Sequence, residues 1–158
     1  MIVLAAFRGI GTPVPVGTCC CDPTIYASVQ MVFHHPAGEP AKPITSAELT
    51  LFIYPQTGTH ANDVTFEVDI SPISGLSVYD VWNQDWSFNL LLNGQPVGRV
   101  IYHYVPETGS SISNFKVNLT VYYNGYIYRA ENCNATEYPF TGLTVNRTAC
   151  TAAPAPNP

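Results

Sequence analysis

The chain has 158 residues, of which 46% are hydrophobic and 11% are charged, and its formal net charge is −5. The six basic residues are scattered singly, so the sequence lacks the basic patch that binds nucleic-acid phosphates. No apolar run approaches the roughly 20 residues that cross a bilayer as a helix. We therefore expect one domain with a full core that binds neither nucleic acid nor membrane.

Residues 1–23 are predicted to form an extended arm, because proline and glycine recur too often for a helix or a long strand. The apolar stretch Ile2–Phe7 has no basic residue before it and is shorter than the roughly seven residues of a secretory signal. We expect an uncleaved arm. It would either complete the sheet of its own domain or dock along a neighbouring molecule.

Residues 24–146 alternate apolar and polar side chains in short runs, most cleanly in Asp63–Ile70. Side chains of a strand point alternately to opposite faces, so this pattern predicts half-buried strands. Turn signals about ten residues apart are typical of a sandwich or a barrel. We expect an all-β, antiparallel β-sandwich of jelly-roll or immunoglobulin-like type. Strands are predicted at residues 24–34, 46–54, 63–70, 76–82, 86–92, 97–105, 115–123 and 126–130, with a weaker one near 138–146.

Two Asn-Gly pairs, Asn93-Gly94 and Asn124-Gly125, lie between strand-like runs. Both residue types accept the positive φ angles of a type I′ turn, so each pair predicts a β-hairpin. Pro96 implies that the return strand of the first hairpin begins at an edge or at Val97. Residues 147–158 are rich in proline and are predicted to form an extended tail.

The five cysteines form two groups, Cys19-Cys20-Cys21 near the start and Cys133 with Cys150 near the end. Their spacing does not match the paired Cys-x2-Cys of a zinc ribbon. Disulfides are favoured, either between the two groups or within a Cys133–Cys150 loop, and we expect at least one that links Cys19, Cys20 or Cys21 to Cys133 or Cys150. Buried, reduced cysteines are the alternative. An odd count leaves one thiol free or paired between molecules.

Candidate catalytic and metal-binding side chains are few. His34 and His35 are neighbours on a predicted strand, so they point to opposite faces and cannot share a metal ion. Glu67 and Asp69 share a face and could bind calcium or serve as acid and base, but a solvated acidic stripe that protects an edge strand is the favoured interpretation. The sequence contains neither a Gly-x-Ser-x-Gly motif nor a glycine-rich phosphate loop. We expect no enzymatic activity, no metal and no cofactor.

Aromatic residues provide the best candidate binding site. Tyr79, Trp82 and Trp86 flank the polar residues 83–85, a combination that suits a sugar-binding surface, although buried tryptophans would give the same pattern. On the second hairpin, Tyr122 is predicted to face outward. Together with Tyr126 and Tyr128 it could form cross-strand aromatic pairs or an interface with another chain.

The string from Cys20 to Val29, followed by a strand-rich body and by Cys133 and Cys150, resembles small structural proteins of tailed bacteriophages. The resemblance covers about the first thirty residues and the tail, and it carries over no functional residue. It implies a head decoration (cement) protein that binds the major capsid protein or other virion subunits. Such a protein is made in the host cytoplasm and then stays on the virion surface, where thiols can oxidise.

Two alternatives remain open. One is a carbohydrate-binding β-sandwich of a tail fibre or of a secreted enzyme, in which case the protein would be extracellular. The other is an extracellular filament subunit whose sheet is completed by a donated N-terminal strand. The outward aromatic surface of the second hairpin leads us to expect a homo-oligomer.

Overall fold

The computed structural model describes residues 25–55, 62–138, 142–145, 151–152 and 154–156. The protein is all-β, as predicted, and its strands pair antiparallel. The predicted arm of residues 1–23 lies outside the described residues, as does much of the tail. The strands are β1 (Ile25–His34), β2 (Ser46–Pro55), β3 (Asn62–Val68), β4 (Trp86–Leu92), β5 (Gln95–Val105), β6 (Phe115–Tyr123), β7 (Tyr126–Tyr138), β8 (Gly142–Val145), β9 (Thr151–Ala152) and β10 (Pro154–Pro156).

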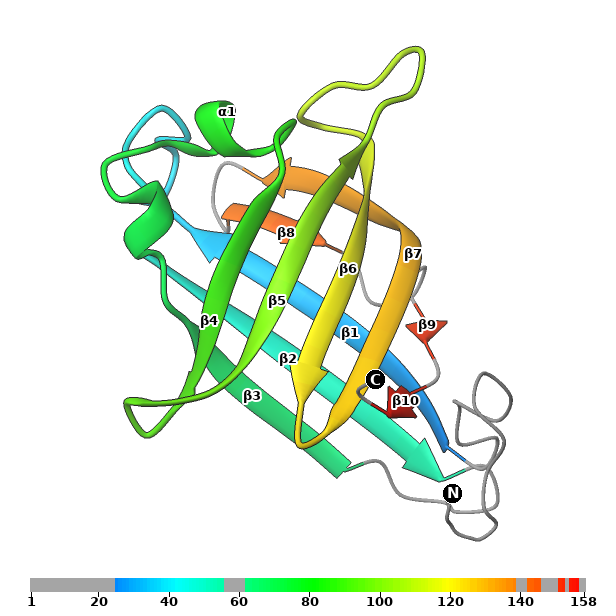
Figure 1. Ribbon diagram of the computed structural model, residues 1–158. Coiled ribbons are helices and arrows are strands. Elements are labelled where there is room, and N and C mark those ends of the chain that lie inside the picture. Colours follow the sequence, from blue (N-terminus) through cyan, green and yellow to red (C-terminus); the bar gives the residue numbers. More distant parts are fainter. Residues whose placement is uncertain (1–24, 56–61, 139–141, 146–150, 153, 157–158) are drawn as a thin grey trace, which may run out of the picture.

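The strands belong to one sheet in which β1 to β7 pair in chain order. The short strand β8 pairs with β7 on one side and with β1 on the other, so the sheet curves round and is nearly closed. Figure 1 shows the result as a barrel-like body, with β4–β7 in front and β1–β3 crossing behind them. Near the C-terminus, β9 pairs with β1, and β10 pairs with β7 beside the β6–β7 turn.

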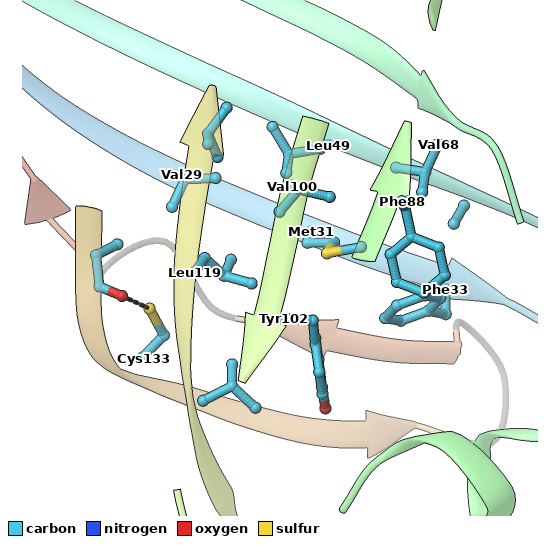
Figure 2. Packing of buried hydrophobic residues seen from close by; sticks show 14 of the residues in the cluster. Val29, Met31, Phe33, Leu49, Val68, Phe88, Val100, Tyr102, Leu119 and Cys133 are labelled. Carbon is cyan, nitrogen blue, oxygen red and sulfur yellow. Dashed lines mark hydrogen bonds between the residues drawn. The ribbon is translucent and has the colours of Figure 1, made fainter. Parts of the chain in front are cut away.

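The interior of this body is filled by large side chains. Phe33, Phe66, Phe88 and Tyr102 are all fully buried, and they come from four different strands. Phe33 makes edge contacts with both Phe88 and Tyr102, at centroid distances of 5.7 and 5.9 Å. Figure 2 shows side chains of β1, β2 and β3 meeting side chains of β4, β5 and β6 in this core. The predicted alternation is confirmed here, because inward positions of β2 and β6 such as Leu49 are buried.

The predicted strand at residues 76–82 is wrong. The chain instead forms the short helix α1 (Val78–Val81), preceded by a single 3₁₀ turn, η1 (Ser71–Ile73). The backbone N–H of Ser77 donates to the Asp80 carboxylate at 2.9 Å, which is half of a capping box. Val78 and Val81 are buried three residues apart, so the apolar positions have helical rather than strand spacing.

Both predicted hairpin turns are present. Asn93 and Gly94 have φ angles of 51° and 78°, and Asn124 and Gly125 have φ angles of 54° and 81°. These positive values are those of a type I′ turn. The return strand β5 begins at Gln95, two residues earlier than predicted, and the register shifts between Leu90 and Leu91 on the facing strand.

Candidate functional site

Trp82 follows α1 at one end of the barrel-like body and is partly buried. Its ring lies edge-on to those of Tyr104 and Phe115, at centroid distances of 5.5 and 5.0 Å. Its backbone carbonyl accepts a hydrogen bond of 2.8 Å from the hydroxyl of Tyr102. Trp82 therefore closes the end of the core with its ring and satisfies a buried hydroxyl with its backbone.

Trp86 begins β4 beside this cluster. Its indole N–H donates to the carbonyl oxygen of Val81 at 2.9 Å, and its ring stacks near Phe88 at a centroid distance of 6.5 Å. Tyr79 is 50% exposed and lies outside these contacts. The structure thus brings the two tryptophans against the core and leaves Tyr79 alone on the surface, with the polar residues 83–85 exposed beside it.

The tyrosines of the second hairpin divide between the two faces of the sheet. Tyr122 points outward and is partly exposed, with the guanidinium of Arg99 5.3 Å from its ring centroid. Tyr126 and Tyr128 pack inward, 6.3 Å apart, and Tyr128 is only 6% exposed. Burial raises the pKa of Tyr128, and the neighbouring Tyr126 and Tyr123 raise it further. Of the three interface candidates Tyr122, Tyr126 and Tyr128, Tyr122 is therefore the one on the outer surface.

Among the candidate disulfide cysteines, Cys133 is the one within the described residues. It lies in β7 and is fully buried, with its sulfur 3.5 Å from the carbonyl oxygen of Ala130 (Figure 2). Cys19, Cys20, Cys21 and Cys150 lie outside the described residues.

The outer face of β2 and β3 is acidic. Glu48 and Glu67 lie directly opposite each other across the two strands, and His34 on β1 approaches Glu48 at 3.3 Å. Asp69 accepts hydrogen bonds from the hydroxyl and the backbone N–H of Ser71, and these bonds lower its pKa. A surface hollow of about 330 Å³ extends beside Glu67, Asp69 and Ser71. Within the described ranges, no three His, Cys, Asp or Glu side chains gather closely enough to hold a metal ion.

A buried polar contact between His35 and Glu137 was not predicted from the sequence. His35 follows β1 and Glu137 lies in β7, so the partners are 102 positions apart. The Nε2 atom of His35 lies 2.9 Å from Glu137, and the two side chains are 0% and 7% exposed. The Nδ1 atom lies 2.8 Å from the carbonyl oxygen of Pro36. A carbonyl oxygen can only accept a hydrogen bond, so Nδ1 carries a hydrogen and donates it to Pro36. Nε2 is then the nitrogen that contacts the Glu137 carboxylate.

The sheet has a partly open edge at β3. Strand β3 pairs with β4 at two positions, Glu67 with Leu91 and Val68 with Leu90. The backbone N–H of Asp69 also donates to the backbone carbonyl oxygen of Asn89. Backbone groups of successive residues in an antiparallel strand face alternate sides, so Thr65 and Asp63 face the same side as Glu67. No described strand pairs with β3 at these two positions on that side. Among the described residues, this short stretch of β3 therefore has no strand beside it on that side.

No family model, curated protein or solved structure matches this chain. In the part of the chain that the structure describes, no helix is long and apolar enough to cross a membrane.

Proposed function

We propose that this protein is a head decoration (cement) protein, which sits on the virion surface and binds the major capsid protein or other virion subunits. The observation that carries the proposal is the filled interior. Eleven large side chains are buried at less than 2% exposure, so the barrel-like body is a solid unit with its contact groups on the outside. A rigid body that binds through its surface suits a structural, non-enzymatic role.

The positions of the chain ends support this role. Strand β1 starts opposite Pro55, and β10 pairs beside the β6–β7 turn at Tyr126–Tyr128. Figure 1 shows both segments at the same end of the barrel. The residues before β1 therefore join the body at this end, from which the predicted arm would be able to reach a neighbouring subunit. The open edge of β3 starts at that end as well, because Asn62 lies opposite Ile53 near the end of β2.

The low charge indicates the kind of contact. Six basic and eleven acidic residues in 158 leave most of the surface to apolar and neutral hydrogen-bonding groups. Attachment would then depend on apolar area and backbone hydrogen bonds, to which ion pairs add little. Tyr122 is a suitable contact residue, because its ring supplies area and its hydroxyl tolerates water.

The proposal is tested by purifying particles from cells that express the gene with its neighbours. Quantitative mass spectrometry of gradient-purified particles should find the chain at a fixed ratio to the major capsid protein. If the chain stays at the top of the gradient while complete particles sediment, the proposal fails.

The same proposal extends to the finer architecture. We infer that β1–β3 and β4–β7 act as two packed layers, which form a flattened body between the predicted sandwich and a round barrel. The buried side chains between the crossing layers in Figure 2 support this description. An experimental structure in which the two layers separate at β8 would favour a true sandwich, and continuous pairing through β8 would favour a barrel.

A second candidate function is that of an extracellular filament subunit. The open edge of β3 favours it, because an edge with free backbone groups can accept a strand donated by the next subunit. Polymerisation that is lost when residues 1–23 are deleted would promote this candidate. Carbohydrate binding would be promoted instead by a glycan-array signal that Trp82→Ala or Trp86→Ala abolishes.

A further inference from the structure

We propose that, in the free protein, the apolar segment Ile2–Phe7 of the same chain adds as a strand to the open edge of β3. This inference concerns the isolated protein, so it goes beyond the proposed function and does not depend on it. It would cover an edge that otherwise invites association with other sheets.

The edge offers the backbone groups that an added strand needs. At Glu67, the edge of β3 that faces away from β2 is paired with β4. Strand β4 ends at Leu92, where the chain turns into β5. The N–H and C=O groups of Thr65 and Asp63 continue the same row, at positions where no described strand pairs with them. An added strand would occupy the place that β4 leaves.

The side chains at this edge suit an apolar strand. Val64 and Phe66 point inward, and Phe66 meets the ring of Tyr123 at a centroid distance of 4.8 Å. Leu92 and Tyr123 are partly exposed beside them and pack against the core. An apolar strand laid against β3 would cover these partly exposed side chains and remove their area from water.

The charges are complementary as well. Ile2–Phe7 is followed by Arg8, the one basic residue in the first 41 positions. On the outer face of β3, Asp63 and Glu67 are both exposed. An added strand with Val3, Ala5 and Phe7 facing inward turns Arg8 outward, toward these carboxylates.

The direction and length of the chain fit an intramolecular strand. A strand antiparallel to β3 ends at the same end of the barrel at which β1 begins, since Ile25 lies opposite Pro55 and Ile53 opposite Asn62. The added strand lies three strand spacings from β1, beyond β3 and β2, so the chain must cross about 14 Å. The 16 residues from Gly9 to Thr24 can span roughly 50 Å when extended. Tethering raises the effective concentration of the strand to the millimolar range, which favours its own chain over a second copy.

Amide hydrogen exchange measured by NMR on the full-length protein tests the proposal. The Asp63 and Thr65 amides should exchange at least about tenfold more slowly in the wild type than in a Leu4→Pro/Ala5→Pro variant, because adjacent prolines remove strand hydrogen bonds in either register. The matched control, Gly11→Pro/Thr12→Pro, places the same change in the linker and should keep the wild-type rates. Protection at Leu119 in β6 should be the same in all three proteins, which shows that the body is folded.

Two results would overturn the proposal. Equal exchange at Asp63 and Thr65 in the wild type and in the Leu4→Pro/Ala5→Pro variant would show that Ile2–Phe7 does not cover the edge. Protection that rises with protein concentration, together with a larger species in analytical ultracentrifugation, would show that the strand comes from a second copy.

Discussion

His35 and Glu137 lie beside the closure of the sheet. Phe33 on β1 and Glu137 on β7 both pair with Leu143, so the two strands flank β8 at the same position. The contact between His35 and Glu137 therefore links β1 to β7 next to a strand of only four residues. A buried pair of this kind is costly to break, because the remaining partner keeps an unsatisfied polar atom in the interior.

We expect Glu137→Leu to lower the free energy of unfolding by about 2–3 kcal/mol, because Nε2 of His35 loses its partner. Glu137→Gln should recover most of this loss, since a glutamine amide can also bond to an imidazole nitrogen. Urea denaturation of the three proteins at neutral pH measures both changes. A Glu137→Leu protein as stable as the wild type would show that the contact contributes nothing.

Among the described residues, Tyr102 is the largest fully buried side chain, and its hydroxyl donates a hydrogen bond of 2.8 Å to the Trp82 carbonyl. Burial raises the pKa of Tyr102 well above its usual value near 10, and Tyr104 and Asp85 add to the effect. The folded protein therefore keeps this proton at a pH at which the unfolded chain has lost it. The corresponding stability is complete below about pH 10 and is lost as the pH rises above that value.

Tyr102→Phe should reduce the alkaline loss of stability by up to about 1.4 kcal/mol per pH unit above pH 10. At pH 7 the same change should cost about 1 kcal/mol, because the hydrogen bond to Trp82 is lost. Denaturation curves between pH 7 and 11 measure both effects. Tyr79→Phe removes a hydroxyl from an exposed side chain and should change neither value. An unaltered pH dependence in Tyr102→Phe would contradict the argument.

The β6–β7 hairpin is the element whose outer surface bears on assembly. Tyr122 lies on that surface with Arg99 against its ring, while Tyr123 shares the inner face with the core. The hairpin is held by its Asn-Gly turn and by the close approach of β5. A Cβ at Gly98 would clash with the carbonyl oxygen of Tyr122, so glycine lets β5 approach β6 closely at this position.

Tyr122→Asp should therefore act on association rather than on folding. We expect incorporation into particles, or self-association of the free protein, to fall at least about tenfold, because a charge is placed in a desolvated contact. The thermal melt should stay within a few degrees of the wild-type Tm. Ser87→Asp changes an exposed residue on the outer side of β4 and serves as the control. Unfolding of Tyr122→Asp would show that the ring supports the fold, and normal association would exclude it from the interface.

At the level of the individual elements, the sequence predicted most strands and the faces that they bury. The alternation of apolar and polar residues along a strand is a local pattern and needs no long-range information. The sequence did not predict α1, whose four residues are too few to show helical periodicity, although the Ser77-x-x-Asp80 spacing was a usable signal. The sequence also predicted that β7 ends at residue 130, because polar residues follow, whereas the strand continues to Tyr138. There Asn132 adopts a φ of 55° and its N–H donates to the side chain of Asn118, so the strand passes through a bulge and continues.

The closure of the sheet could not be read from the sequence. Strand β8 joins β1 to β7, and neither the pairing of Leu143 with Phe33 nor the contact of His35 with Glu137 leaves a local pattern. The sequence identified the tryptophan cluster, but whether its rings face the core or solvent depends on how α1 folds over the end of the barrel-like body.

At the level of the whole molecule, we expect a disulfide bond near β8, the strand that closes the sheet between β1 and β7. Cys150 directly precedes β9, which pairs with β1 and lies beside β7, the strand that carries Cys133. These neighbours favour a Cys133–Cys150 disulfide over the link from Cys19, Cys20 or Cys21 that we expect from the sequence alone. In the chain-entropy model such a bond contributes about 3 kcal/mol for a loop of this length. Mass spectrometry of a non-reduced digest should find the linked peptides. Five alkylatable cysteines would contradict the disulfide, and a link from Cys133 to Cys19, Cys20 or Cys21 would contradict the pairing.

The central claim is that this body attaches to a particle through apolar area and backbone hydrogen bonds. Washing purified particles in about 1 M salt tests it most directly, because the Debye length then falls to about 3 Å and ion pairs are screened. The amount of this chain per major capsid protein, measured before and after the wash, should stay the same. Release of the chain into the supernatant at that salt concentration, from particles that remain intact, would contradict the account.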